Sequence, residues 1–284
     1  MPYIEEDAKQ DVEVERQRRR WALTGGPERG KTTSLLTFKH PIAIVSCPDE
    51  LGFGSIPKHA HEGGVATCLS TCPRWQVDVF LFGAVDAVKP DWIGTIEETR
   101  RLMADLVIGK KTWRDQRYKT VAVDGWHKLY PVYLNLQSGG RLAKGESFDG
   151  RKIYPTANAL FFNDARRWCQ SDVEWLIFTM WVERDSDDPN DPTASTHFFP
   201  ALSGKAGQNV VGEIGITLAA ERQGTGGAAR YIWLTQPDTK YWGVGCHLPL
   251  ELAAKLPPSV PQRWEAITPY LGLSPIYTSK DLGQ

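Results

Sequence analysis

The sequence predicts an α/β fold with a mostly parallel sheet, helices on both faces of that sheet, and an antiparallel extension toward the C-terminus. Short apolar runs alternate with helical patterns over the first 185 residues, which is typical of a parallel sheet. After Pro200 the apolar runs follow one another with turn residues between them, as antiparallel strands do. No linker-like stretch divides the chain, so we expect a single domain over residues 21–284, preceded by a polar arm over residues 1–20.

The first strand leads into a glycine-rich loop. Residues 25–32 read Gly-Gly-Pro-Glu-Arg-Gly-Lys-Thr, which is the G-x-x-x-x-G-K-[ST] pattern of a phosphate-binding loop. Glycines let the backbone turn tightly, so that successive N–H groups converge on an anion. We expect Lys31 to reach the β- and γ-phosphates of ATP and Thr32 to bind Mg²⁺. The residues expected around the nucleotide are Gly25, Gly26, Pro27, Glu28, Arg29, Gly30, Lys31, Thr32 and Thr33.

The elements on either side of this loop favour phosphate binding over a glycine-rich surface turn, which is the alternative. An apolar strand over residues 21–24 precedes the loop, and a helix over residues 31–39 follows it. The N-terminus of that helix points its positive dipole end at the phosphates. His40 precedes Pro41 and so ends the helix, because the residue before a proline is disfavoured in the α region.

The remaining elements follow from apolar periodicity and from breaker residues. Thr95 and Glu98 form the pattern of a capping box and predict a helix that ends near Gly109. A glycine- and lysine-rich loop is expected over residues 138–155. Further strands are predicted over residues 42–47, 77–82, 120–124, 173–182, 214–221, 230–235 and 241–247. Further helices are predicted over residues 126–137, 157–170, 248–255 and 261–271.

Two carboxylates complete the expected site. Asp124 ends a short apolar strand and fits the Walker B aspartate that holds Mg²⁺, although it could instead cap the next helix. Glu50, with Asp49 beside it, follows the strand over residues 42–47. If that strand lies next to the strand of the P-loop, Glu50 comes near the γ-phosphate and can polarise the attacking water. The predicted catalytic residues are therefore Glu50 and Lys31.

The order of these motifs resembles the RecA/RadA recombinase ATPases. The P-loop, the segment Ile-Ala-Ile-Val-Ser-Cys-Pro-Asp-Glu and the segment Val-Ala-Val-Asp-Gly follow one another as in that core. The compact size and the stretch over residues 199–218 are similar to phage-encoded RecA-like ATPases associated with single-strand annealing. The resemblance covers residues 20–250 and implies that Asp124 serves the metal and Glu50 activates water. The chain departs from the family over residues 178–181, where RecA proteins carry an Asn-Gln pair whose Gln senses the γ-phosphate.

The resemblance also implies partners. RecA-like ATPases assemble as rings or filaments in which a neighbour's cation completes the site, and the candidates here are Lys205, Arg222 and Arg230. The loops expected to contact DNA are residues 138–155 and 184–205. The first has interleaved cations and aromatics suited to single-stranded DNA, namely Arg141, Lys144, Phe148, Arg151, Lys152 and Tyr154. The second has four aspartates over residues 185–191, which would repel phosphates.

Composition narrows the functional classes. A net charge of −1 and a pI of about 6.6 argue against nucleic-acid binding through bulk positive charge. No segment approaches the ~18 apolar residues of a membrane helix, and the N-terminus lacks a secretory pattern. Five cysteines are expected as free thiols, so we expect a cytoplasmic protein without a membrane partner. A zinc site is the alternative for His59, His61, Cys68 and Cys72, and loop histidines with buried thiols are favoured instead.

The leading hypothesis is a Mg²⁺-dependent, RecA-like ATPase that binds single-stranded DNA and supports phage-type homologous recombination or annealing. Its expected partners are single-stranded DNA, further copies of the chain and a single-strand DNA-binding protein. A nucleotide-dependent switch or assembly module with little hydrolysis and a protein partner is the alternative. A P-loop kinase is a third possibility, but the acidic segment over residues 185–196 does not resemble an arginine-rich lid.

Overall fold

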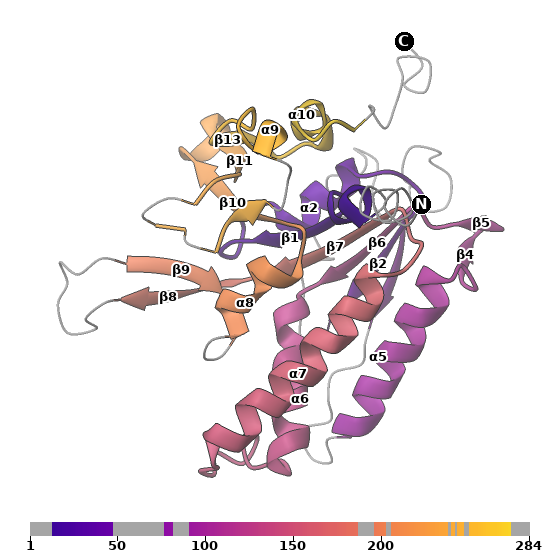
Figure 1. Cartoon of the computed structure of the whole chain (residues 1–284), viewed down its shortest axis with the longest axis vertical. Helices are drawn as coiled ribbons and strands as arrows, with labels where there is room; N and C mark the ends of the chain where they lie inside the picture. Colours follow the sequence, from indigo (N-terminus) through magenta and orange to yellow (C-terminus); the bar gives the residue numbers. More distant parts are fainter. Residues whose placement is uncertain are drawn as a thin grey trace, which may run out of the picture.

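The computed structural model describes residues 13–47, 77–81, 91–186, 196–202, 206–237, 240–241, 243–246 and 250–273. These residues form an α/β structure around a mixed sheet of nine strands, in which parallel pairing predominates (Figure 1). Its path runs β13-β11-β10-β1-β7-β6-β2-β3, and β12 pairs with β10. The predicted fold class is confirmed at this level of mostly parallel sheet and flanking helices.

Six strands run parallel and form the body of the sheet. They are β1 (Arg20–Thr24), β2 (Ile42–Ser46), β3 (Val77–Leu81), β6 (Thr120–Asp124), β7 (Trp175–Met180) and β10 (Ile216–Gln223). Three antiparallel strands extend it beyond β10, namely β11 (Arg230–Leu234), β12 (Gly245–Cys246) and β13 (Ser259–Pro261). The antiparallel extension is therefore confirmed, except that its first predicted strand, β10, is parallel to β1.

The strand order corrects one premise of the sequence analysis. Strand β2 does not lie next to the P-loop strand β1, because β7 and β6 stand between them. The condition under which Glu50 is expected near the γ-phosphate, a strand β2 directly beside β1, is therefore not met. Glu50 itself lies outside the described residues, so its role remains a prediction.

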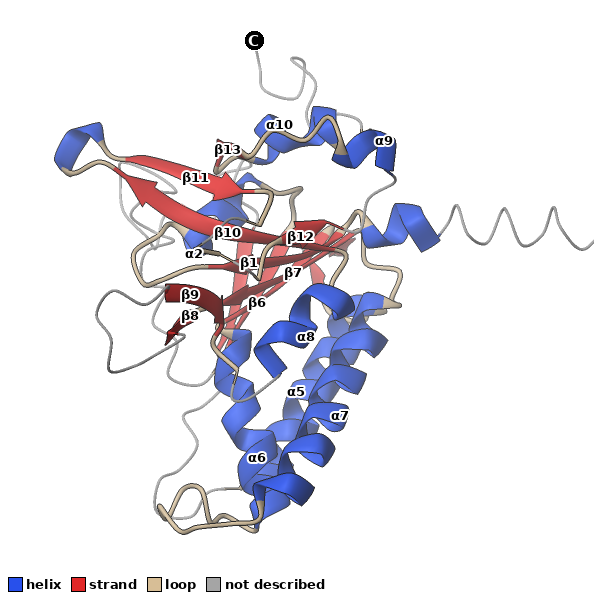
Figure 2. Cartoon of the chain, turned by 60° about the vertical axis from the view of Figure 1, so that its left-hand side comes forward, coloured by secondary structure: helices blue, strands red, loops and turns tan. Residues whose placement is uncertain are grey.

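Alternating side chains of the parallel strands build two cores, one on each face of the sheet. Along β2, for example, Val45 packs into one cluster and Ile44 into the other, as a period of two requires. The first cluster receives α5 (Trp92–Val107), α6 (Tyr130–Ser138), α7 (Gly150–Cys169) and α8 (Ala206–Glu213). The second receives η1 (Leu35–Thr37) and α10 (Trp264–Ile267), with η5 (Thr268–Tyr270) directly after it. Figures 1 and 2 show helices on both faces, with α9 (Leu250–Ala253) near α10.

Buried tryptophans hold the C-terminal segment against the sheet. The ring of Trp21 on β1 lies 5.1 Å from that of Trp264, 5.7 Å from that of Trp233 and 5.2 Å from that of Phe38, measured between centroids. All four side chains are fully buried. Burial of rings this large contributes more to a core than most side chains do. This cluster fixes the strand that leads into residues 25–32.

Several helix boundaries differ from the prediction. Helix α5 begins at Trp92 because the Asp91 side chain accepts a hydrogen bond from the Gly94 N–H at 2.8 Å, so the predicted Thr95 capping box is wrong. Helix α7 begins at Gly150 and contains Pro155, so the predicted loop ends at Asp149. The helix after the P-loop, α2 (Lys31–Ser34), passes into η1 and ends before His40.

Three features were not predicted from the sequence. Helix α8 is one of them, and a short hairpin of β4 (Thr112–Trp113) and β5 (Gln116–Arg117) is another. The third is a hairpin of β8 (Val182–Ser186) and β9 (Thr196–Pro200), which follows β7 directly. Of the polar arm predicted over residues 1–20, residues 13–17 are helical and Arg20 already belongs to β1.

Candidate nucleotide-binding site

The loop after β1 adopts a conformation that only glycine tolerates at two of its positions. Gly25 and Gly30 have φ angles of 153° and 80°, and Glu28 has a φ of 58°. A Cβ at Gly25 would lie 2.6 Å from the Ala220 carbonyl oxygen, and one at Gly30 would lie 2.6 Å from Gln262 Oε1. Alternation of left- and right-handed residues turns successive N–H groups to one side, which is the geometry of an anion-binding nest.

Lys31 is fixed against the backbone of this loop. Its ammonium donates hydrogen bonds to the carbonyl oxygens of Gly25 at 2.9 Å and Gly26 at 2.7 Å. The side chain is buried, so its positive charge acts through little solvent. The loop thus holds a buried cation at the carboxyl edge of the sheet, where α/β proteins bind ligands.

The buried carboxylate of Asp124 joins the P-loop to the end of β6. The Thr32 hydroxyl lies 3.1 Å from Oδ1 and 3.0 Å from Oδ2 of Asp124, across 92 positions of sequence. Asp124 is 1% exposed, and this burial raises the pKa of its carboxyl group. Hydrogen bonds from Thr179 and Thr32 and the charge of Lys31 oppose that rise in the pKa. The sequence-predicted pair of Mg²⁺ ligands is therefore brought together.

Thr179 is a site residue that the sequence analysis missed. Its hydroxyl donates to Asp124 Oδ1 and accepts the Gly125 N–H at 2.9 Å, so it orients both the carboxylate and the turn that follows. The strand β7 that carries it lies between β1 and β6. A signal was available, since Thr179 is the only polar residue of the Trp175–Met180 strand and lies next to its carboxyl end.

His127 lies in η3 (Trp126–Leu129), just beyond Asp124, and was also not predicted to belong to the site. It is 7% exposed, and its Nδ1 accepts the Trp181 N–H at 3.4 Å. Burial lowers the pKa of the imidazole to about 3, with further lowering by the charges of Lys128 and Lys31. The ring of Trp181 lies 5.3 Å from that of His127 and has the Lys128 ammonium 4.6 Å from its centroid.

The antiparallel strands that follow β10 also contact the P-loop. Gln262 donates from Nε2 to the carbonyl oxygens of Arg29 and Ile232, both at 2.9 Å. Arg29 in turn donates to the carbonyl oxygen of Arg222 at 3.1 Å. Tyr231 is 41% exposed, and its ring lies close to Gly30. The loop is thus held by the C-terminal strands as well as by β1.

Some of the remaining residues predicted from the sequence lie near the P-loop, and others lie outside the described part of the chain. Arg222 and Arg230 lie in the β10–β11 hairpin, and the Arg222 carbonyl oxygen accepts a hydrogen bond from Arg29 of the P-loop in the same chain. The predicted residues outside the described part of the chain are Glu50, His59, His61, Cys68, Cys72 and Lys205. Pro27, Glu28 and Thr33 belong to the loop and the first turn of α2, and each has some solvent exposure.

The predicted first DNA loop turns between α6 and α7, at the end of this helix pair that is far from the sheet (Figures 1 and 2). Its four cations, Arg141, Lys144, Arg151 and Lys152, are exposed. Phe148 and Tyr154 are half-buried, and their ring centroids lie 5.8 Å apart. The two rings therefore pack on each other, which leaves the cations as the accessible part of this segment.

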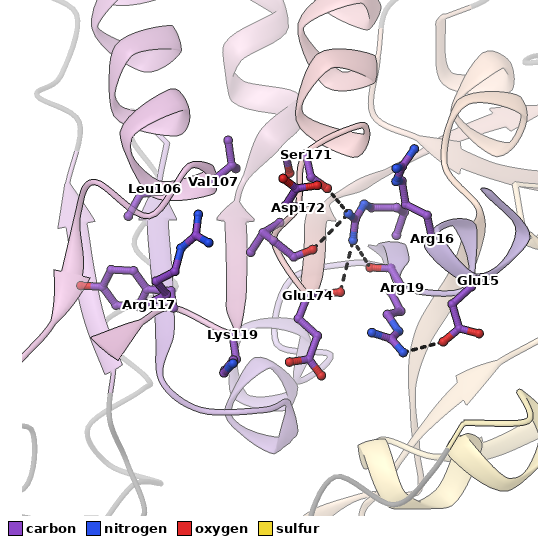
Figure 3. A pocket seen from close by; sticks show the side chains of 13 residues that line it. Glu15, Arg16, Arg19, Leu106, Val107, Arg117, Lys119, Ser171, Asp172 and Glu174 are labelled. Atoms are coloured by element: carbon purple, nitrogen blue, oxygen red, sulfur yellow. Dashed lines mark hydrogen bonds and ion pairs between the residues drawn. The ribbon is translucent and has the colours of Figure 1, made fainter. Parts of the chain in front are cut away.

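A pocket of about 420 Å³ lies at the opposite, amino edge of the sheet. Figure 3 shows its mixed charges, with the Arg19–Glu15 ion pair on one side of the pocket and Arg117 on the other. The buried guanidinium of Arg20 donates to the carbonyl oxygens of Arg19, Cys169, Ser171, Val173 and Glu174. Arg20 therefore satisfies backbone oxygens after the C-terminus of α7, which is a structural role.

The residues at the P-loop fit ATP with Mg²⁺. Thr32 and Asp124 supply hydroxyl and carboxylate oxygens, the kind of ligand that Mg²⁺ prefers, and Mg²⁺ takes few protein ligands because it also binds phosphates and water. Within the described ranges no cluster of three or more His, Cys, Asp or Glu side chains could hold a metal by itself. This arrangement suits a metal that arrives with the nucleotide.

Comparisons with known proteins do not assign this chain to a family. No protein-family model matches the sequence, and no curated protein matches it. Among the helices of the described residues, none combines the length and apolar character needed to cross a membrane.

Proposed function

We propose that this chain is a P-loop ATPase of the RecA-like kind, which binds ATP with Mg²⁺ at the carboxyl edge of the sheet. The observation that carries the proposal is the contact between Thr32 and both carboxylate oxygens of Asp124. Thr32 lies in the helix that follows β1 and Asp124 ends β6, and these strands are not adjacent. A glycine-rich surface turn would have no reason to bring the two residues together. The position of Lys31 against the loop carbonyls supports the same reading.

The chain's own groups have distinct roles in this proposal. The backbone N–H groups of residues 25–32 and the Lys31 ammonium bind the phosphates and stabilise the charge that develops during hydrolysis. Thr32 and Asp124 would hold Mg²⁺, which neutralises charge on the β- and γ-phosphates when bound. Thr179 keeps the Asp124 carboxylate in place. Glu50 is the proposed residue that polarises the attacking water.

Single-stranded DNA is the proposed second ligand, and support for it comes from the turn between α6 and α7. Its exposed cations can neutralise phosphates, an interaction that weakens as salt increases. We propose phage-type recombination or annealing as the process and further copies of the chain as partners. A protein-directed switch with little hydrolysis remains the alternative, because it requires the same nucleotide site.

The test measures ATP hydrolysis with and without single-stranded DNA. We expect Mg²⁺-dependent hydrolysis that DNA accelerates, and Lys31→Ala should abolish nucleotide binding because it removes the buried cation. Binding by Lys31→Ala that equals the wild type would refute the P-loop assignment. Nucleotide binding without hydrolysis at any DNA concentration favours the switch. If Glu50→Gln hydrolyses ATP at the wild-type rate, the assignment of Glu50 is wrong.

A further inference from the structure

A dense group of positive charges lies at the amino edge of the sheet, at the opposite end of the strands from the P-loop. Residues 108–119 contain five cations and one carboxylate, whereas the whole chain has a net charge of −1. They connect α5 to β6 and include the β4–β5 hairpin, which projects from the molecule (Figure 1). The amino-edge cations, all with exposed side chains, are Lys110, Lys111, Arg114, Arg117 and Lys119.

The tip of this hairpin holds an arginine in a backbone conformation that arginine disfavours. Trp113 pairs with Gln116, so Arg114 and Asp115 form a two-residue turn, and their φ angles are 44° and 68°. Positive φ at both central positions is the pattern of a type I′ turn, which prefers Asn-Gly. Stability alone therefore does not account for an arginine at the tip, and an outlier of this kind points to a function of the side chain.

Aromatic rings support two of the charges. The Lys111 ammonium lies 5.5 Å from the ring centroid of Phe80, and the Arg114 guanidinium lies 5.4 Å from that of Trp113. Both rings pack against the first core. The stems of the two cations therefore lie on apolar surface while their charges remain in solvent. The same contacts cover the rings, and within the described ranges no large aromatic side chain of this edge is exposed.

Few carboxylates neutralise the amino-edge cations. Lys110 pairs with Asp105 at 3.3 Å. In the part of the chain that the structure describes, Lys111, Arg117 and Lys119 form no ion pair with a carboxylate. The group therefore keeps most of its charge available to a ligand.

The pocket of about 420 Å³ marks where this positive surface ends. Arg117 and Lys119 line the pocket from the hairpin side. On the other side Arg19 already pairs with Glu15 at 2.5 Å, and Asp172 adds a further carboxylate to the lining (Figure 3). The accessible excess of positive charge is thus confined to the hairpin and the two residues that lead into β6.

We propose that the amino-edge cations bind the phosphate backbone of duplex DNA without contacts to its bases. Five exposed cations within residues 110–119 are more than one small anion engages, so they suit a polyanion. Ile108 is the large apolar side chain exposed at this edge, and one such residue is too little for the apolar centre of a protein interface.

The covered rings decide between the two forms of DNA. Proteins that bind single strands stack the bases on aromatic side chains, and the aromatic rings of Phe80 and Trp113 already have cations over them. Contacts to phosphates alone position a duplex without reading its sequence. This surface is separate from the turn between α6 and α7, which lies far from the sheet (Figures 1 and 2). The inference goes beyond the proposed function and does not require the nucleotide site.

The test titrates a fluorescent duplex of random sequence at several salt concentrations, without nucleotide, so failure of the proposed ATPase cannot affect its result. We expect Lys111→Gln with Arg114→Gln to weaken binding about 10-fold and to reduce the slope of log K against log salt by about 1.8, because each lost phosphate contact removes about 0.9. The matched control is Lys255→Gln with Arg263→Gln, which removes the same charge from exposed positions in the C-terminal segment and should keep the wild-type slope.

Arg114→Asn separates binding from folding. Asparagine suits the type I′ turn, so we expect a stability at least equal to that of the wild type, together with a slope reduced by about 0.9. A wild-type slope in the hairpin variants overturns the inference, and so does an equal loss in the control pair, which would indicate net charge alone. A loss confined to a single-stranded oligonucleotide overturns the assignment to duplex DNA. A wild-type chain that does not bind the duplex refutes the inference whatever the ATPase measurement shows.

Discussion

The Thr32 hydroxyl lies within 3.1 Å of both carboxylate oxygens of Asp124, so a hydrogen bond joins two residues that are 92 positions apart in the sequence. The Thr32 hydroxyl and the Asp124 carboxylate both supply oxygen atoms, and each belongs to an ordered element of the fold. Asp124 ends a strand buried along its whole length, and Thr32 lies in the first turn of α2. The Mg²⁺ of the proposed site would therefore find the Thr32 hydroxyl oxygen and the Asp124 carboxylate already close together.

Removal of the Thr32 hydroxyl should therefore weaken Mg²⁺-dependent nucleotide binding. We expect Thr32→Val to lower the affinity for ATP with Mg²⁺ by about 10- to 100-fold, because a hydrogen-bonding group next to a charge is lost. Thr32→Ser keeps the hydroxyl and should stay close to the wild type. Calorimetry with and without Mg²⁺ measures the effect. An equal loss in the absence of the metal would contradict a role in metal binding.

Thr179→Val should lower stability as well as activity. The substitution keeps the shape of the side chain but leaves the Asp124 carboxylate and the Gly125 N–H without this hydroxyl. We expect a loss of about 1–3 kcal/mol in the free energy of unfolding, the usual cost of a buried group that loses its partner. Chemical denaturation measures it, with Thr179→Ser as the control. A stability equal to that of the wild type would show that this hydroxyl is dispensable.

Gly30→Ala should disrupt the loop more than the same change at another left-handed glycine. A Cβ at Gly30 meets Gln262, whereas one at Gly139, which has a similar φ of 64°, meets no atom within 4 Å. Gly139→Ala therefore measures the backbone strain alone, about 1 kcal/mol. We expect Gly30→Ala to cost more than this and to abolish nucleotide binding. Equal effects of the two substitutions on stability would indicate that the Gln262 contact relaxes freely.

The buried His127 should make stability fall as the pH decreases below about 6.5. Burial holds the pKa of the folded imidazole at about 3, while the unfolded chain has the ordinary value of 6.5. Between these values the unfolded chain binds the extra proton, so acid favours unfolding, and we expect a loss of about 2 kcal/mol from pH 7.5 to pH 5. His127→Gln should reduce this slope in urea titrations at several pH values. A slope unchanged by His127→Gln would show that other groups cause it.

Local sequence patterns predicted the parallel strands and the sharp turn after β1 well, because both depend on neighbouring residues. The apolar run that ends in Asp124 is one example, and the glycines at 25 and 30 are another. The order of strands was not predictable in the same way, since no local feature places β7 between β1 and β6. The contact of Thr179 with Asp124 follows from that order, and its single local signal is that Thr179 is the only polar residue of its strand.

The positions at which helices begin were also only partly predictable from local sequence patterns. Asp91 and Thr95 are both plausible caps by composition, and the structure selects Asp91 because its carboxylate reaches the Gly94 N–H. The sequence predicts Pro155 at the end of a loop, yet it lies within α7, where packing of the helix against the first core outweighs the poor helix propensity of proline. Tertiary contacts decide such cases.

The strand order also has a consequence for biosynthesis. Strand β1 emerges first among the sheet strands, but its two neighbours, β7 and β10, lie more than 150 residues later in the chain. Both edges of β1 therefore stay unpaired on the ribosome until residues 175–223 have been made, which exposes an apolar strand to misassembly. The proposed nucleotide site needs Asp124 and Thr179 beside the loop after β1, so nucleotide binding during translation is expected to report that β6 and β7 have assembled next to β1.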